Sequence, residues 1–315
     1  MVIPSITIGE RQIGEGAPCF LIAEAGVNHN GDPEQARRLV DAAADAGSDA
    51  VKFQTFRSEH LASPQAPKAD YQHRSTDAGE SQLDMLRRLE LPRSAYPVLQ
   101  ARCAERGILF LSSAFDEADA DFLAQLGAPA IKIPSGELTN LPFLAHAARR
   151  GLPLIVSTGM AALREVEEAV AAIREAGGRG LVLLHCVSRY PAPAAHANLR
   201  AMRTLADAFG VPVGFSDHTP GIAVAVAAAA LGAHVIEKHL TLDRSLPGPD
   251  HSSSLDPREF RALVEHCRCG QPLVKLTRIP ALQLLTGILL DDFVGIVLEY
   301  VTGEDPAYEV HTLDE

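Results

Sequence analysis

Short apolar runs alternate with amphipathic segments of helical period along most of the chain. The apolar runs predict strands over residues 20–24, 50–54, 108–113, 130–133, 153–157, 181–185, 212–216 and 234–239. The amphipathic segments predict helices over residues 33–46, 81–106 in two pieces, 117–126, 140–150, 162–176, 197–208, 221–231 and 256–267. Asp32 with Pro33 and Asp256 with Pro257 have the residue types of helix starts.

Strands that alternate with helices in this way predict an α/β fold with a parallel sheet. The number of repeats is the one that closes a (β/α)8 TIM barrel. An open doubly wound sheet is the main alternative, but residues 24–31 after the first strand lack its Gly-rich phosphate loop. A short hairpin over residues 3–13 precedes the barrel. We therefore expect a barrel domain over residues 1–268 and an appended, non-barrel C-terminal segment of unknown fold over residues 269–315.

The composition limits the class of protein further. The 315 residues are 47% hydrophobic and carry a net charge of −12. An acidic chain argues against a nucleic-acid partner or an anionic membrane surface. We expect no signal peptide, because the first residues lack a basic segment followed by an apolar one, and the longest apolar stretch, residues 222–231, is too short to cross a bilayer. The five cysteines are read as reduced thiols, so we expect a cytoplasmic protein.

Polar side chains stand at the C-terminal end of every predicted strand, the edge at which (β/α)8 barrels carry their active sites. Because side chains alternate along a strand, Lys52 and Gln54 share one face, and Glu237 and His239 share another. A charge that points into a barrel needs a partner or a substrate. The polar strand-end residues are Glu24, Lys52, Gln54, Ser113, Lys132, Ser135, Glu137, Ser157, Thr158, His185, Ser188, Ser216, Asp217, His218, Glu237 and His239.

Lysine is rare in this chain, and its placement indicates a role. The 28 basic residues include only five lysines, of which Lys52, Lys132 and Lys238 fall at strand ends. A compact ammonium group suits a phosphate, a carboxylate or Schiff-base chemistry. The alternative for Lys52 or Lys132 is an ion pair with a buried glutamate.

Two histidines end neighbouring predicted strands. His218 and His239 should therefore lie close together, and two imidazoles leave a metal with open positions for substrate and water. Nearby carboxylates would favour Mn²⁺ or Mg²⁺ over Zn²⁺. The alternative is that both histidines are hydrogen-bonded structural residues.

Eight sequence segments, in order along the chain, carry a resemblance to a known family. They are IAEAGVNHNGD (22–32), VKFQTF (51–56), ESQLDMLRRLEL (80–91), IKIPSGELTN (131–140), STGM (157–160), LLHCVSRYP (183–191), GFSDHT (214–219) and EKHLTLDRSLPGPDHSSSL (237–255). These segments resemble the N-acetylneuraminate (sialic acid) synthase family, which includes legionaminic acid synthases and spore-coat polysaccharide synthases. The resemblance spans residues 17–268.

The resemblance implies a cytoplasmic enzyme of carbohydrate biosynthesis. Its members condense phosphoenolpyruvate with an N-acylated hexosamine, similar to N-acetylmannosamine, to give a nine-carbon 2-keto sugar acid and phosphate, with a divalent metal. By motif, phosphoenolpyruvate would be held by Lys52, Ser113, Lys132, Ser135, Ser157 and Ser216. The sugar would be contacted by Gln54, Glu137, Tyr190 and Asp250. His218 and His239 would bind Mn²⁺ or Mg²⁺ near Glu237, and Glu24 would be the acid/base group.

The chain departs from the family pattern at three places. Ser188, a further substrate-binding candidate, stands where the family often has asparagine. The run Tyr71 to Glu80, a loop that would contact the sugar, lacks the family's usual Asn-Thr-Gly and has Ser75, Thr76 and Asp77 there instead. The family's antifreeze-like C-terminal domain, which supplies an arginine to the partner subunit's site, is not recognisable after residue 268. An apolar C-terminal segment suggests a homodimer.

Two other functions fit the same barrel. One is a Schiff-base aldolase in which Lys132 or Lys52 is the nucleophile and no metal is needed. The other is a barrel that binds ligand without turnover because the C-terminal lid domain is altered.

Overall fold

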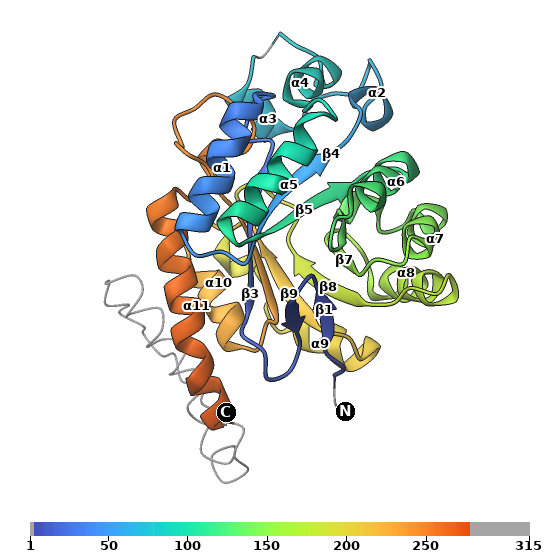
Figure 1. The fold of residues 1–315 in the computed structure, drawn as a ribbon, viewed down its shortest axis with the longest axis vertical. Helices are drawn as coiled ribbons and strands as arrows, with labels where there is room; N and C mark the ends of the chain where they lie inside the picture. Colours follow the sequence, from blue (N-terminus) through green and yellow to red (C-terminus); the bar gives the residue numbers. More distant parts are fainter. Residues whose placement is uncertain (1–2, 78, 278–315) are drawn as a thin grey trace, which may run out of the picture.

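The computed structural model describes residues 3–77 and 79–277, with side chains up to residue 268 apart from those of residues 70 and 74. Within this part of the chain, eight parallel strands close into a barrel in sequence order, with the last strand paired to the first (Figure 1). The strands are β3 (Phe20–Gly26), β4 (Ala50–Thr55), β5 (Leu109–Ala114), β6 (Ile131–Ile133), β7 (Leu154–Ser157), β8 (Leu181–Cys186), β9 (Val213–Asp217) and β10 (Val235–His239). The predicted (β/α)8 barrel is confirmed, and each strand lies where the apolar runs place it.

Helices connect successive strands and cover the outside of the barrel. They are α1 (Pro33–Asp45), α2 (Ser58–Leu61), α3 (Asp70–Ser75), α4 (Gln82–Leu89), α5 (Ala95–Arg106), α6 (Glu117–Leu126), α7 (Leu141–Arg149), α8 (Leu163–Glu175), α9 (Ala201–Phe209), α10 (Ala223–Ala230) and α11 (Pro257–Thr277), with 3-10 turns η1 (Ser135–Glu137), η2 (Ala194–His196) and η3 (His251–Ser253). Asp32 and Asp256 cap α1 and α11 by accepting hydrogen bonds from backbone N–H groups, as the sequence predicts. None of the described helices is long and apolar enough to span a membrane.

Two differences from the sequence prediction concern helices. The helices α2 and α3, in the long excursion after β4, are not among the predicted helices. They are short and polar, so the sequence has no apolar period there that would indicate a helix. The helix α11 runs to Thr277, beyond the predicted end at residue 267. Residues 278–315, which make up most of the predicted C-terminal segment, lie outside the described part of the chain.

A short antiparallel hairpin closes the N-terminal end of the barrel. Strands β1 (Ile6–Ile8) and β2 (Arg11–Ile13) form it, as the alternating isoleucines predict. Ile8 and Ile13 are fully buried and belong to the same apolar cluster as Ile22 and Leu111, which point into the barrel. The hairpin therefore seals the barrel interior on the side opposite the strand ends that carry the polar residues.

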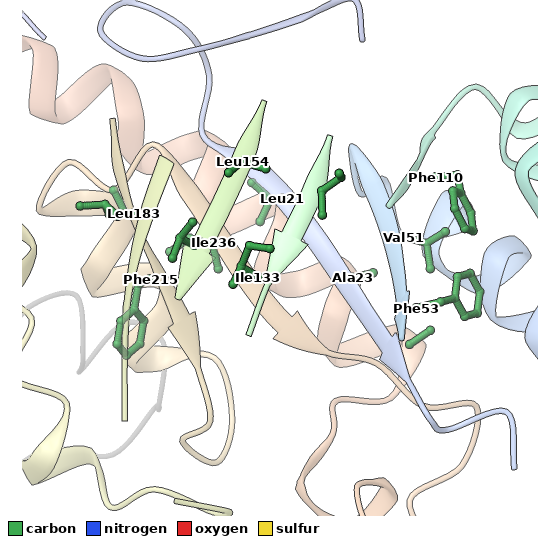
Figure 2. Packing of buried hydrophobic residues seen from close by; sticks show 14 of the residues in the cluster. Leu21, Ala23, Val51, Phe53, Phe110, Ile133, Leu154, Leu183, Phe215 and Ile236 are labelled. Atoms are coloured by element: carbon green, nitrogen blue, oxygen red, sulfur yellow. The ribbon is translucent and has the colours of Figure 1, made fainter. Parts of the chain in front are cut away.

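Apolar side chains on the two faces of the barrel strands form two separate clusters. The outward-facing residues Leu21, Val51 and Phe215 pack against the surrounding helices as part of the main core (Figure 2). The inward-facing residues, such as Ile22 and Ala50, fill only the lower part of the barrel. The four cysteines with described side chains are buried and unpaired, as predicted: Cys19, Cys103, Cys186 and Cys267.

Candidate active site

The inner face of each strand changes from apolar to polar on the way to the barrel mouth. On β4, Ala50 belongs to the inner apolar cluster, and Lys52 and Gln54 follow on the same face. On β10, Val235 is followed in the same way by Glu237 and His239. The two-residue period thus places most of the predicted site residues in one ring. The inward-facing polar residues are Glu24, Lys52, Gln54, Ser113, Lys132, Ser157, Cys186, Ser216, Glu237 and His239.

Two lysines and two glutamates form a buried ion-pair network at the centre of this ring. The Nζ atom of Lys52 lies 2.7 Å from Oε2 of Glu24 and 3.7 Å from Oε2 of Glu237. The Nζ atom of Lys132 lies 3.9 Å from Oε1 of Glu237. Ser113 accepts a hydrogen bond from Lys52, and Ser216 donates one to Glu237. Both Lys52 and Lys132 therefore pair with buried glutamates, as the alternative interpretation of the sequence proposed, and these ion pairs lie inside the predicted site.

The two glutamates have opposite pKa shifts. Burial raises the pKa of Glu24 to about 7, because the attraction of Lys52 offsets only part of the desolvation cost. Burial also raises the pKa of Glu237, but Lys132, Lys52 and the hydrogen bond from Ser216 outweigh it and lower that pKa to about 2. Glu24 can therefore hold a proton near neutral pH while Glu237 remains charged. Two carboxyl groups whose pKa values differ in this way can serve one as an acid and the other as a base.

The two lysines also differ in pKa. The carboxylates of Glu237 and Glu24 outweigh burial and raise the pKa of Lys52. Burial lowers the pKa of Lys132, whose nearest carboxylate is more distant. Both ammonium groups are available to an anionic ligand, which would compete with the glutamates for them.

His218 and His239 lie side by side at the mouth, as their strand positions predict. Their ring centroids are 5.6 Å apart. Nδ1 of His218 lies 2.8 Å from the carbonyl oxygen of Val187, which fixes the tautomer with a proton on Nδ1 and leaves the Nε2 lone pair exposed to a ligand. Nδ1 of His239 has no hydrogen-bond partner among the described residues, and Asp250 Oδ2 is 3.9 Å away.

Burial makes both imidazoles neutral bases. It lowers the pKa of His218 and, together with the neighbouring His218, lowers the pKa of His239 well below its ordinary value. Neutral imidazole is the form that binds metals. No group of three or more histidine, cysteine or acidic side chains has metal-binding geometry within the described residues.

Aromatic rings cover the histidine pair. The Tyr190 ring lies 4.2 Å from His218 and 5.8 Å from His239, measured between centroids. The ring of Tyr71 in α3 stacks on Tyr190 with 5.3 Å between the centroids. The family resemblance places Tyr71 at the start of a loop that would contact the sugar, but no periodicity in the sequence indicates that it packs on Tyr190. Burial, with Asp250 nearby, raises the pKa of Tyr71, so its hydroxyl stays protonated.

A cluster of small polar groups lies beside Lys132. The Oγ atom of Ser135 accepts a hydrogen bond from the backbone N–H of Gly159 and contacts Sγ of Cys186 at 3.2 Å. A Cβ atom at Gly159 would lie 2.3 Å from Ser188 Oγ, so the close packing of these groups requires glycine there. Ser157 Oγ, on the adjoining strand end, has no hydrogen-bond partner among the described residues. These hydroxyl and thiol groups could surround a small anion.

The predicted sugar-binding residues divide into two groups. Gln54 donates a hydrogen bond to Glu24 at 3.3 Å. A Cβ atom built on Gly26 would lie within 3.6 Å of Asp250 Oδ2 and closer still to Glu24 and Gln54, so these three side chains converge. Glu137 is not joined to them, since it lies in η1 and accepts a hydrogen bond from Asn140.

Strand-end residues that do not face the barrel interior include Lys238, Asp217 and His185. Lys238 follows Glu237 and therefore points outward, where it pairs with Asp217 at 2.6 Å. The expectation of an anion-binding role for this third strand-end lysine is therefore wrong. His185 also points outward, with its Nε2 at 2.8 Å from the Ala197 carbonyl oxygen and its ring against Phe215.

Comparison with known proteins shows to which family this site belongs. The NeuB family matches residues 39–273. N,N'-diacetyllegionaminic acid synthase of Legionella pneumophila is 50% identical over 270 residues, which cover 84% of this chain and 76% of the relative. Human N-acetylneuraminate-9-phosphate synthase is 36% identical over 259 residues, covering 82% of this chain and 72% of the human protein.

Solved structures agree with the sequence relatives. N-acetylneuraminic acid synthetase from Leptospira borgpetersenii, in complex with citrate, superposes with a TM-score of 0.80 at 34% identity and covers 91% of this chain and 96% of its own. The spore coat polysaccharide biosynthesis protein spsE of Bacillus subtilis gives a TM-score of 0.75 at 40% identity, with coverage of 87% and 74%. The chain therefore belongs to the NeuB family and is an enzyme of the sialic acid synthase type.

Proposed function

We propose that the protein condenses phosphoenolpyruvate with an N-acylated hexosamine to give a nine-carbon 2-keto sugar acid and phosphate, with the help of a divalent metal. The observation that carries this proposal is the buried network of Lys52, Lys132, Glu24 and Glu237 beside the His218–His239 pair. The network combines anion-binding groups, a carboxyl group that retains a proton and a pair of metal-binding bases in one ring. The names of the relatives support the same reaction type.

The lysine half of the ring suits phosphoenolpyruvate. Lys52 and Lys132 lie on either side of Glu237, and both are buried. The phosphate and carboxylate of the ligand would replace the glutamates as ion-pair partners of the two ammonium groups. The hydroxyl groups of nearby serines would donate further hydrogen bonds, namely those of Ser113, Ser135, Ser157 and Ser216. Charge-assisted hydrogen bonds of this kind are about twice as strong as neutral ones. As Lys52 turns to the anion, its hold on Glu24 weakens, which raises the pKa of Glu24 further.

The histidine half of the ring fits a divalent metal. His239 Nδ1 and Glu237 Oε2 are buried atoms without a hydrogen-bond partner among the described residues, and a cation would satisfy both. His218 binds the Val187 carbonyl oxygen through Nδ1, the outer contact that orients imidazole ligands. His218 and His239 would hold the ion with Glu237 close by, and the mixed nitrogen and oxygen donors suit Mn²⁺ or Mg²⁺. The bound ion would polarise the aldehyde of the open-chain sugar.

Glu24 supplies the proton that the aldehyde oxygen takes up. Carbon 3 of phosphoenolpyruvate forms a bond to the sugar aldehyde carbon, and the aldehyde oxygen becomes a hydroxyl group by taking a proton from Glu24. Water adds to carbon 2 of the former phosphoenolpyruvate and releases a proton, which restores Glu24. The bond from carbon 2 to the phosphate oxygen then breaks, the hydroxyl group on carbon 2 becomes the keto group, and its proton leaves with the phosphate. Lys52 and Lys132 stabilise the phosphate as it leaves.

Gln54, Tyr190 and Asp250 would orient the sugar. They lie at the mouth, closer to solvent than the lysines, and Gln54 and Asp250 converge with Glu24 around Gly26. Tyr190 covers both histidines and so stands beside the polarised aldehyde. A cytoplasmic homodimer remains a prediction.

Release of inorganic phosphate tests the proposal. The full chain is incubated with phosphoenolpyruvate, Mn²⁺ or Mg²⁺, and a panel of N-acylated hexosamines that differ in stereochemistry and acylation. We expect phosphate release that depends on one sugar and stops with EDTA. Binding of phosphoenolpyruvate without release for any sugar would instead identify a barrel that binds ligand but does not turn over.

A Schiff-base aldolase is the second candidate, and the lowered pKa of Lys132 favours it. A neutral lysine can attack a carbonyl group without a metal. Borohydride would then trap substrate on Lys132, and EDTA would leave the activity unchanged. Sensitivity to EDTA together with the absence of a trapped adduct would exclude this mechanism.

A further inference from the structure

A buried ion pair lies directly behind the two histidines, on the outer face of the barrel. Lys238 of β10 pairs in register with Asp217 of β9, and Nζ lies 2.6 Å from Oδ2. Each residue comes two positions after an outward-facing core residue, Ile236 and Phe215 respectively. Both side chains are almost completely buried. The pair therefore lies in the layer between the strands and the helices, out of reach of any ligand in the barrel.

The ion pair holds the backbone that follows His218. Asp217 Oδ1 accepts a hydrogen bond from the Thr219 N–H at 2.8 Å, and Lys238 Nζ donates to the Thr219 carbonyl oxygen. Asp217 and Thr219 flank His218 in the sequence, so the ion pair links the side chain before this histidine to the peptide groups after it. Lys238 in turn immediately precedes His239. One buried interaction thus links the backbones that carry both imidazoles.

Stability alone does not explain charged groups at this place. Two buried charges lose their hydration, and apolar residues of similar volume are often as stabilising or more so. The preceding outward-facing residues on the same two strands, Phe215 and Ile236, are apolar and belong to the main core, so charged side chains are not the rule in this layer. Directional contacts to the Thr219 carbonyl oxygen and N–H are what an apolar pair could not supply.

We propose that Lys238 and Asp217 are positioning residues that hold His218 and His239 at the separation a divalent metal requires. This inference rests on the metal site of the proposed function. The pair touches neither substrate nor metal and acts through the backbone of the two histidines. Loss of the pair should therefore weaken metal binding while the barrel remains folded.

The proposal is tested by titrating the full chain with Mn²⁺ alone. Calorimetry and the electron paramagnetic resonance signal of unbound Mn²⁺ measure the binding. The double variant Asp217→Leu/Lys238→Met replaces both charges with apolar groups and leaves neither unpaired. We expect its melting temperature to stay at or above that of the wild type, and its Mn²⁺ affinity to fall about 10- to 100-fold, the effect of losing an outer contact to a metal ligand. Saturating Mn²⁺ should restore its turnover.

A control removes a different, half-buried ion pair. Arg93 pairs with the fully buried Asp119 of α6, beyond β5 on the opposite side of the barrel. The variant Arg93→Met/Asp119→Leu should retain wild-type Mn²⁺ affinity. If the Asp217→Leu/Lys238→Met variant does not fold, Asp217→Asn keeps the acceptor for the Thr219 N–H, removes the charge, and should weaken Mn²⁺ binding by a smaller factor.

The outcomes separate the two proposals. A wild-type chain that binds no Mn²⁺ would overturn the metal site itself, and the positioning role with it. A wild-type chain that binds Mn²⁺, together with a folded Asp217→Leu/Lys238→Met or Asp217→Asn variant of equal affinity, would overturn the positioning role alone.

Discussion

Replacing Glu24 with glutamine removes the carboxyl group whose pKa the barrel raises to about 7. A carboxyl group with a folded-state pKa above its unfolded value of about 4.5 stabilises the fold when protonated. This contribution is complete below the unfolded pKa and disappears as pH rises through about 7. Between about pH 5 and about pH 8 the wild type should therefore lose roughly 2–3 kcal/mol of unfolding free energy through Glu24. Glutamine cannot ionise, so the Glu24→Gln variant should lack this loss.

Urea unfolding of ligand-free wild type and Glu24→Gln at both pH values measures the effect. Other groups also titrate in this window, among them Asp250, whose pKa burial raises to about 6. They contribute to both proteins, so the difference between the two pH dependences isolates Glu24. The pH profile of kcat/KM provides a second readout, because a proton donor with this pKa gives a falling limb near pH 7.

Two results would refute the reasoning. Equal pH dependence of stability in both proteins would show that Glu24 is already ionised at neutral pH. A Glu24→Gln variant with undiminished turnover would show that another group donates the proton. The matched variant Asp119→Asn removes a carboxyl group whose pKa burial raises to about 6, outside the barrel interior, and should change the pH dependence of stability without affecting kcat.

Three further predictions concern the ligand-binding groups. His218→Ala or His239→Ala should abolish metal-dependent turnover while circular dichroism shows an intact fold, and full activity of either would exclude the metal site. Lys132→Ala should weaken phosphoenolpyruvate binding by about 1.5–3 kcal/mol, the loss typical of a charged hydrogen bond, which calorimetry can measure; unchanged affinity would refute its role. Tyr71→Ala should raise the KM for the sugar several-fold with little change for phosphoenolpyruvate, because Tyr71 supports Tyr190 from outside; an unchanged sugar KM would exclude that support.

The barrel and much of its site could be predicted because they follow short-range patterns. The length of the apolar runs and the helical period of the segments between them predict the repeat, and alternation along a strand predicts which residues face inward. Lys52 with Gln54, and Glu237 with His239, were paired correctly by this rule alone. The same rule excludes Lys238 from the interior, although its position at a strand end suggested a ligand-binding role.

Other parts of the site depend on contacts between distant segments. Tyr71 reaches Tyr190 from an excursion of short helices, and no periodicity indicates where such a segment packs. The opposite protonation of Glu24 and Glu237 depends on their distances from Lys52 and Lys132, which sequence spacing does not contain. The family resemblance assigns different roles to the two glutamates, but the physical reason, their opposite pKa shifts, is visible only in three dimensions.

The hairpin that seals the lower end of the barrel also affects the order in which substrates bind and products leave. With Ile8 and Ile13 closing one end, every ligand passes through the mouth. Lys52 lies two residues deeper than Gln54 on the same strand, a distance of about 7 Å. Under the proposed function, the anion must enter before the sugar, and its phosphate must leave after the sugar acid has cleared the mouth. Closure of the lower end thus implies an ordered mechanism, in which phosphoenolpyruvate binds first and its phosphate group is released last.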